Sequence, residues 1–278
     1  MRLGATSMIY PGSLVENVEL LAPYVDDIEL IFYWTEDDLT NYPTPRELER
    51  LRELAERWRL TYTVHLPSYL RPTPWDERRW ERDRVRNLRL VELVNPLKPW
   101  SYLMHWEPAL AGREPAPDFA AWLEWQLRLV ESLVEEGGVA PRDLAIENLS
   151  YDYRLIEAPI EARGLGVCLD LGHLWQTEWG AEEILEWALG RARVYHLHGV
   201  LSKGRDHVAL QAANLPALER WQRLLSARYQ GEDDFVLTWE LFSQSDLRAS
   251  WELLAAWQPA WRQEIEPRLA KWRSAPRE

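Results

Sequence analysis

Residues 166–173 read Gly166-Val-Cys-Leu-Asp170-Leu-Gly-His173. A short, near-continuous apolar run is typical of a parallel strand that is covered on both faces. The run ends on Asp170, and an aspartate inside an apolar strand is costly to bury unless it is paired or binds a cation. His173 follows three residues later, in the turn after the strand. The stretch therefore predicts a buried parallel strand with two candidate metal ligands at its carboxyl end.

Seven other runs of this kind flank it, and longer helical patterns separate them. Strands that alternate with helices in this way indicate βαβ units and a parallel sheet. The chain has 278 residues and an eight-unit α/β barrel typically needs about 250, so we expect a closed (β/α)8 TIM barrel. No Gly-rich phosphate loop follows the first run, which disfavours a dinucleotide-binding fold. The predicted strands are residues 3–7, 28–33, 60–66, 101–106, 144–149, 166–171, 193–200 and 235–242.

Helix start and stop signals mark several of the intervening segments. Thr44-Pro45-Arg46-Glu47 is a capping box with proline at the first helical position. Asp118 is expected to cap a helix that stops at the pair Gly137-Gly138. Ser243 or Ser245 can cap the helix after the eighth strand. Helices are expected over residues 45–58, 75–94, 119–136, 181–189, 215–228 and 259–272.

The chain is expected to form one domain over residues 1–278, because no linker or low-complexity segment interrupts the alternation. Residues 258–278 form a predicted C-terminal helical extension, which we expect to pack as an appendage of the barrel. The 17 tryptophans fall mostly on predicted helix faces, where large aromatic side chains supply core area.

Composition narrows the function classes. The formal net charge of −13 argues against a duplex nucleic acid partner, which usually meets a Lys/Arg surface. Cys168 is the only cysteine, so an internal disulfide and a thiolate zinc cluster are excluded, and a reducing cytoplasm is expected. The apolar runs are too short for a membrane span, and Met1 leads directly into a strand without a signal-peptide pattern. A small-molecule substrate is expected, and the oligomeric state is open.

The six histidines are not scattered. Each falls at, or just after, the carboxyl end of a predicted strand, and none falls in the long helical segments, which make up a large share of the chain. The carboxyl ends of barrel strands form the face on which TIM-barrel active sites are built. The histidines are His65, His105, His173, His196, His198 and His207.

Three carboxylates occupy equivalent places. Glu147 closes the fifth predicted strand, Asp170 the sixth and Glu240 the eighth. Imidazole and carboxylate ligands together suit zinc, manganese, iron or cobalt, of which zinc and manganese are favoured. The spacing Asp170-x-x-His173 lets one strand end and the following turn supply two neighbouring ligands. The sequence therefore predicts a divalent-metal centre at the barrel mouth.

Each strand-end histidine or carboxylate, taken alone, also has a purely structural interpretation. A strand-end histidine is more often a core or hydrogen-bonding group, and a strand-end glutamate can pair with an arginine. His198 is discounted as a ligand because it already enters the loop. Asp206 is the weaker ligand candidate.

Weaker candidates surround the centre. Lys203 and Arg205 follow the seventh strand, where many barrels hold phosphate, although a solvated turn is an equally simple interpretation. Glu29 and Asn148 are candidates to contact substrate or to orient a ligand, and Gln176 is another such contact. The arginine-rich run over residues 78–89 is interpreted as a salt-bridged helix face, and Cys168 as a core residue.

The strand-end series resembles the xylose isomerase-like TIM-barrel superfamily, which includes sugar epimerases and apurinic-site endonucleases. The epimerase branch implies one metal ion held by Glu147, Asp170, His196 and Glu240, with the two glutamates moving protons at a sugar carbon. The endonuclease branch implies two or three ions that cleave a phosphodiester, and it adds further ligands. In that branch the Asp and His after the seventh strand are separated by one residue, whereas here they are adjacent. The added ligands would be His65, His105, His173, Asp206 and His207.

Within the superfamily, four segments look like the cobamide-remodelling phosphodiesterases: residues 2–7, 21–30, 60–67 and 167–175. This resemblance implies hydrolysis of the nucleotide-loop phosphodiester of a cobamide, a B12-type corrinoid, to a cobinamide phosphate and a lower-ligand riboside. It implies His65, His105, Glu147 and Glu240 as catalytic residues, with two or three divalent ions per chain. A single-metal sugar isomerase or epimerase, and a barrel that binds a ligand without turnover, stay open as alternatives.

Overall fold

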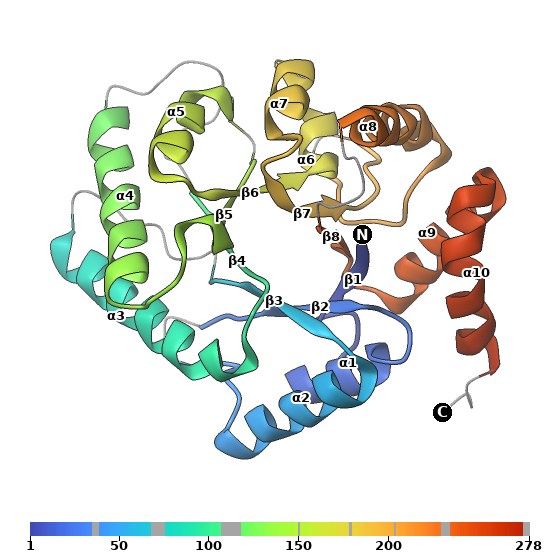
Figure 1. Cartoon of the computed structure of the whole chain (residues 1–278), viewed down its shortest axis with the longest axis horizontal. Coiled ribbons are helices and arrows are strands. Elements are labelled where there is room, and N and C mark those ends of the chain that lie inside the picture. Colours follow the sequence, from blue (N-terminus) through green and yellow to red (C-terminus); the bar gives the residue numbers. More distant parts are fainter. Residues whose placement is uncertain are drawn as a thin grey trace.

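A computed structural model describes residues 1–34, 39–67, 76–106, 118–149, 151–177, 180–202, 204–228 and 234–274. Eight parallel strands close into a barrel in chain order, with β8 pairing back to β1, and helices surround them (Figure 1). The predicted (β/α)8 TIM barrel is therefore confirmed. The strands are β1 Arg2–Thr6, β2 Asp27–Ile31, β3 Thr61–His65, β4 Ser101–His105, β5 Leu144–Glu147, β6 Gly166–Asp170, β7 Ala192–Leu197 and β8 Val236–Trp239.

The helices begin at the predicted first residue more often than they end at the predicted last residue. Thr44 forms the expected capping box with Glu47, and Ser243 accepts the capping hydrogen bond from Asp246. Asp118 lies at the cap position, but its side chain makes no capping hydrogen bond, so that prediction was wrong. The helices are α1 Leu14–Leu21, α2 Pro45–Trp58, α3 Glu77–Val94, α4 Phe119–Glu135, α5 Arg154–Arg163, α6 Leu171–Gln176, α7 Ala181–Ala188, α8 Leu215–Arg228, α9 Gln244–Trp257 and α10 Pro259–Ser274.

The interior of the barrel is layered. Successive side chains of a strand point to opposite faces, so every second residue enters the barrel. A small buried apolar cluster fills its middle and is separate from the main core. The polar strand ends lie directly above it, since Glu147, Asp170 and His196 each follow a member of this cluster by two residues. The barrel plug, as we call this cluster, consists of Leu103, Ala145, Cys168, Val194 and Val236.

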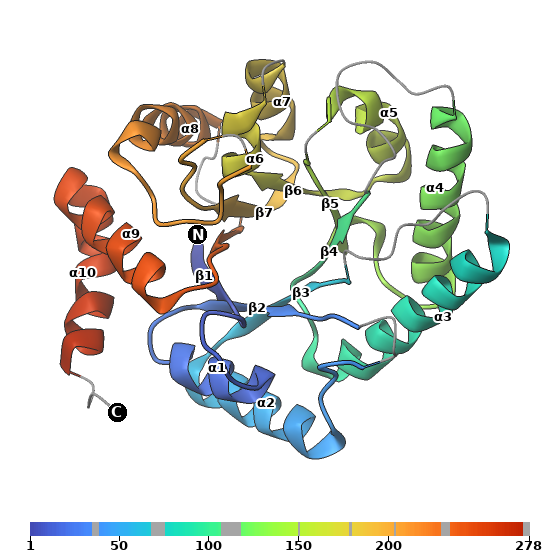
Figure 2. The same ribbon diagram turned by 180° about the vertical axis from the view of Figure 1, so that it is seen from behind.

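The C-terminal helix α10 packs alongside α9 at the edge of the molecule (Figure 2). Trp261, Ile265 and Leu269 are buried in this contact. Trp272 stacks on Tyr24, with ring centroids 5.1 Å apart. The extension thus contributes apolar side chains to the main core between the barrel and its helices. No helix among the described residues is long and apolar enough to cross a membrane.

Candidate metal centre

The ends of strands β3 to β8 bring the predicted ligands together at the barrel mouth. His65 and His105 are the last residues of β3 and β4, and Glu147 and Asp170 are the last of β5 and β6. His196 is the penultimate residue of β7. Their ligand atoms form overlapping groups in which all atoms lie within 4.8 Å of one another. The side chains that the sequence analysis singled out on one rim therefore converge in space.

The first group joins His65, His105 and Glu147. The Nε2 atom of His105 lies 3.0 Å from Oε2 of Glu147, and Nε2 of His65 lies 3.7 Å from the same oxygen. The two imidazole rings meet edge to face, with centroids 4.7 Å apart. His65 is held in place because its Nδ1 atom lies 2.9 Å from the Leu66 carbonyl oxygen. One carboxylate oxygen thus faces two imidazole nitrogens.

The second group joins Glu147, Asp170, His196 and Glu240, all of them buried. The Nδ1 atom of His196 lies 3.0 Å from Oε2 of Glu240. The same nitrogen lies 3.6 Å from Oε2 of Glu147 and 3.7 Å from Oδ2 of Asp170. Three carboxylates therefore surround one imidazole nitrogen. Glu147 belongs to both groups, so the two groups share a ligand.

A third group consists of His173, His198 and His207. His198 was discounted as a ligand, but it is fully buried and its ring stacks on that of His207, with centroids 4.1 Å apart. Asp206 is absent from every described group. Its carboxylate instead accepts a hydrogen bond of 2.6 Å from Nε2 of Gln176. In this corner His198, and not Asp206, groups with His173 and His207 among the described residues, and the role of Asp206 as a ligand stays a prediction.

Two backbone features create that third group. A Cβ atom at Gly172 would lie 2.0 Å from Cε1 of His198, so only glycine leaves room for the ring. His207 has a φ of 51°, in the left-handed region that non-glycine residues rarely adopt. Its backbone N–H donates to Nδ1 of His198 at 3.1 Å. Nε2 of His198 lies 3.2 Å from Oδ2 of Asp170, so an ion bound here would replace one of these two hydrogen bonds.

Glu29 and Asn148, the candidates to contact substrate or to orient a ligand, each contact a candidate metal ligand. Glu29 is fully buried, and its Oε2 atom lies 2.9 Å from Nε2 of His196. This contact leaves Nδ1 of His196 to face the carboxylates. Asn148 accepts a 2.6 Å hydrogen bond from the backbone N–H of Asp170 and donates one of 2.9 Å to its carbonyl oxygen. Hydrogen bonds of this kind orient metal ligands, so both residues are placed to orient the candidate ligands His196 and Asp170.

The remaining candidates lie in the segment after β7. Arg205 is exposed, and its backbone N–H donates to the Ser202 carbonyl oxygen in a tight turn. Lys203 lies outside the described residues. The role of either cation in substrate binding stays a prediction.

Sequence reasoning did not single out Gln126 on α4, which lies behind His105. Within the described part of the chain, neither atom of its fully buried side-chain amide has a hydrogen-bond partner. Gln126, His105 and Asn87 line one small cavity of about 10 Å³, which approaches the size that holds a water molecule. A polar residue on the otherwise apolar face of a helix was the signal that could have found it.

The carboxylates and histidines shift one another's pKa. Burial on its own raises the pKa of Glu147, but the charges of His105 and His196 outweigh it and hold that pKa well below its usual value. Burial lowers the pKa of His173, yet Asp170 and Glu147 raise it to about 10. In the absence of metal, protons on the histidines therefore balance the carboxylates, and a bound cation would take over that role.

The residues present fit a divalent cation. Among the described side chains, Oε2 of Glu240 and Nδ1 of His196 are buried 3.0 Å apart without a well-aligned hydrogen bond, and Oε1 of Glu147 is buried 3.4 Å from Nδ1 of His173. Buried polar atoms are rarely left unsatisfied, and Glu240, His196 and Glu147 all belong to the second group. Cys168 lies close enough to join Glu147 and His196 geometrically, but burial raises the pKa of its thiol well above the usual value. The donors are therefore imidazole and carboxylate, which suit zinc or manganese.

Comparison with known proteins assigns the family. A family model described as xylose isomerase-like TIM barrel matches residues 24–266. The chain belongs to the xylose isomerase-like TIM barrel family. An uncharacterized protein of Methanocaldococcus jannaschii is 23% identical over 257 residues, which cover 83% of this chain and 82% of that protein.

Solved structures of this barrel type include both a nuclease and sugar epimerases. Endonuclease IV from Thermus thermophilus superposes with a TM-score of 0.59 at 18% identity, covering 96% of this chain and 100% of that one. An L-ribulose 3-epimerase gives a TM-score of 0.63 at 16% identity, covering 100% and 99%. D-psicose 3-epimerase from Clostridium cellulolyticum gives 0.62 at 14%, covering 98% of each chain. At these identities the likeness extends to the xylose isomerase-like barrel itself, and the chemistry has to be argued from the site.

Proposed function

We propose that this xylose isomerase-like barrel is a metal-dependent phosphodiesterase that hydrolyses the nucleotide-loop phosphodiester of cobamides. The observation that carries the proposal is the position of Glu147, which belongs both to the group with His65 and His105 and to the group with His196. A shared carboxylate between two adjacent ligand groups is the arrangement that a two-metal hydrolase needs. The product pair would be a cobinamide phosphate and a lower-ligand riboside.

Some of the residues at the barrel mouth would bind metal ions, and others would position the side chains that bind them. Divalent ions in the two groups would make hydroxide available near neutral pH and neutralise charge on the phosphate. His65 and His105 project from adjacent strands and fix one side of Glu147. Oε2 of Glu240 is buried and lies 3.0 Å from Nδ1 of His196, and this oxygen can accept a proton or bind a cation. Glu29 would orient the His196 ring, because its Oε2 atom lies 2.9 Å from Nε2 of His196.

Three considerations support a cobamide as the substrate. The segments at residues 60–67 and 167–175, which contain His65 and Asp170, resemble the cobamide-remodelling enzymes. The net charge of −13 disfavours long nucleic acids, which need many cationic contacts. A single phosphodiester needs only a local positive site, and Arg205 in the loop after β7 can add one contact to it.

The direct test is incubation of the purified chain with a cobamide and Mn²⁺ or Zn²⁺, followed by mass analysis. We expect cobinamide phosphate and the riboside in equal amounts. His65→Ala and His105→Ala should each lower the rate by more than about 100-fold, because each removes a ligand of the first group. The exposed substitution Arg78→Gln on α3 serves as control and should retain full activity.

Two results would overturn the proposal. One is a chain that binds metal but releases no cobinamide phosphate from any cobamide offered. The other is unchanged hydrolysis by both histidine variants, since the first ligand group would then have no part in the reaction.

A sugar epimerase is the second candidate, because the second group is complete without His65 and His105. Glu147 and Glu240 would move protons at a sugar carbon, and one ion bound with Asp170 would orient the substrate. In that case metal analysis should give one ion per chain, and ketoses should be converted. Epimerase activity should then survive His105→Ala, so the same variant distinguishes the two functions.

A further inference from the structure

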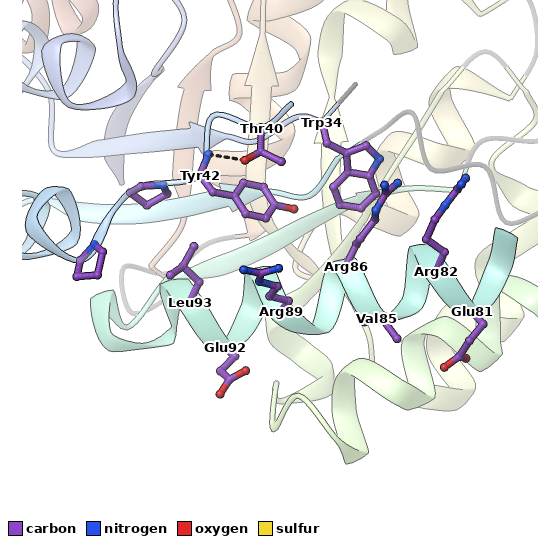
Figure 3. A pocket seen from close by; sticks show the side chains of 12 residues that line it. Trp34, Thr40, Tyr42, Glu81, Arg82, Val85, Arg86, Arg89, Glu92 and Leu93 are labelled. Atoms are coloured by element: carbon purple, nitrogen blue, oxygen red, sulfur yellow. Dashed lines mark hydrogen bonds between the residues drawn. The ribbon is translucent and has the colours of Figure 1, made fainter. Parts of the chain in front are cut away.

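Helix α3 borders two hollows of different size. The larger is a groove of about 1160 Å³ along its exposed side, open towards the segment after β2 (Figure 3). Arginines of α3 pair with nearby carboxylates, as the salt-bridged interpretation of residues 78–89 expects: Nε of Arg82 lies 3.8 Å from Oδ1 of Asp83, and Arg84 pairs with Glu136. The smaller hollow, a cavity of about 10 Å³, lies against the buried side of α3 and contacts a candidate metal ligand.

The small cavity lies between the ends of β3 and β4 and the helices α3 and α4. Its described walls are mostly apolar, with Met104 of β4 and Leu129 of α4 among them. Three polar side chains also line it: Asn87, His105 and Gln126. His105 belongs to the first ligand group, so the cavity adjoins the candidate metal centre on the side of the surrounding helices.

Gln126 carries an amide that no other described group satisfies. The side chain is fully buried, and neither Oε1 nor Nε2 has a hydrogen-bond partner in the described part of the chain. Its neighbours on the buried face of α4 include Trp122 and Leu129, and an apolar side chain would fill the same space without the cost of burying an amide. Buried polar side chains nearly always have a partner, either in the protein or in an ordered water. The amide therefore indicates a partner held in the cavity.

The size of the cavity suits one water molecule. A site for a buried water needs about 10–15 Å³ of this kind of volume and two to four polar partners, and an organic ligand is far too large for it. The Nδ2 atom of Asn87 already donates to the Asp83 carbonyl oxygen of its own helix at 2.9 Å. Gln126 on α4 and His105 on β4 are the other polar side chains among the described walls.

A water in this place would act on the His105 ring. The Nε2 atom of His105 lies 3.0 Å from Oε2 of Glu147, and the Nδ1 atom is buried. When one imidazole nitrogen binds a metal, the other usually donates to an oxygen, which fixes the tautomer and the orientation of the ring. His65 of the same ligand group has a contact of this kind, because its Nδ1 atom lies 2.9 Å from the Leu66 carbonyl oxygen.

We propose that one water molecule fills this cavity and joins the Gln126 amide to the His105 ring, which makes Gln126 a positioning residue for the first ligand group. Nδ1–H of His105 would donate to the water, and the water would donate to Oε1 of Gln126. Nε2 of the ring would then keep its lone pair for a cation beside Glu147. The inference rests on the first ligand group of the proposed function and concerns how tightly that group binds an ion.

The test replaces Gln126 by methionine, which keeps the length of the side chain and removes its polar atoms. Competition of the purified chain with a chelator measures the Zn²⁺ site that depends on His105. We expect Gln126→Met to weaken that site by about 10–100-fold, the range found for such supporting contacts, and Gln126→Leu to have the same effect. Gln126→Glu keeps an oxygen that accepts the hydrogen bond and should restore most of the affinity.

Two controls separate positioning from a general effect on the fold. Leu129→Met alters the apolar wall of the same cavity and should bind Zn²⁺ like the unaltered chain. In a chain that carries His105→Ala, Gln126→Met should weaken binding of the remaining Zn²⁺ no further, because a residue that acts through His105 then has no ligand to position. Such a double-variant comparison isolates the coupling between two residues.

Three results would overturn the inference. They are normal Zn²⁺ affinity of Gln126→Met, an equal loss in Leu129→Met, and a loss of the same size when His105 is already alanine. These results do not depend on cobamide hydrolysis. A chain that gives the expected Zn²⁺ affinities but releases no cobinamide phosphate would contradict the proposed function and leave the role of Gln126 supported.

Discussion

Glu29 and His196 form a buried pair between β2 and β7, and the contact sets which imidazole nitrogen faces the carboxylates. Glu29→Gln replaces an anionic partner by a neutral amide, so the ring loses its fixed orientation and part of its basicity. We expect metal affinity or activity to fall by about 10–100-fold, the range found for such supporting contacts. Competition with a chelator measures the affinity. An unaltered dissociation constant would show that Glu29 does not position the ligand.

Asp27 lies two residues before Glu29, fully buried, with its carboxylate 2.5 Å from Oγ1 of Thr61. Burial raises its pKa from 3.8 to about 7. The unfolded aspartate ionises near pH 4, so between pH 4 and 7 the folded state holds the extra proton and stability falls as pH rises. The loss above pH 7 is on the order of 4 kcal/mol.

Asp27→Asn removes this ionisation and keeps a polar partner for Thr61. We expect the variant to have the larger free energy of unfolding at pH 8, with the advantage shrinking towards pH 5. Urea unfolding at both pH values measures the difference, and the exposed substitution Glu219→Gln controls for the lost charge. An advantage of equal size at both pH values would contradict the explanation.

At the residue scale, the sequence predicted which side chains are candidate metal ligands better than it predicted where each side chain lies in the fold. His65, Glu147 and Asp170 stood out because charged or imidazole groups end apolar strands. His198 was set aside because it already enters the loop after the seventh strand. That loop folds back through a bridge between Gly199 and Val208 and buries the ring, and no local pattern encodes such a contact.

At the scale of elements, all eight strands were predicted, because parallel strands covered on both faces read as apolar runs. The helices α1, α5 and α6 were not named, although Ser13 and Glu16 form a capping box that marks the start of α1. The helix α6 has six residues and begins directly after β6, with Asp170 as its cap. A helix of this length is too short to show a helical period, so the sequence analysis interpreted these residues as a turn.

The helix α10 offers a test at this scale. Trp261 is 3% exposed and packs in the main core, so Trp261→Ala should lower the free energy of unfolding by about 3–5 kcal/mol. Gln263→Ala changes an exposed residue of the same helix and should stay within about 0.5 kcal/mol. Denaturant unfolding measures both. Equal stability of the two variants would mean that α10 is a detachable appendage.

At the scale of the whole molecule, the candidate metal centre would couple ion binding to pH. His173 has a pKa of about 10 because of Asp170 and Glu147, and a histidine must be neutral to bind a metal. Ion binding therefore has to release protons at neutral pH, and affinity should rise from pH 6 to pH 8. Calorimetry in buffers of different ionisation enthalpy counts the released protons. Affinity that does not change with pH would exclude His173 as a ligand.

A cysteine in the barrel plug can be used to measure how often the interior of the barrel opens. Cys168 is the only thiol in the chain, and it is fully buried in the layer beneath the metal centre. A thiol reagent can reach it only when the barrel opens, so the labelling rate counts openings of the innermost layer. Ions bound in the first and second groups above the plug would together join the ends of β3 to β8. The ratio of the Cys168 labelling rates with and without metal would then measure how much a bound ion stabilises the closed barrel.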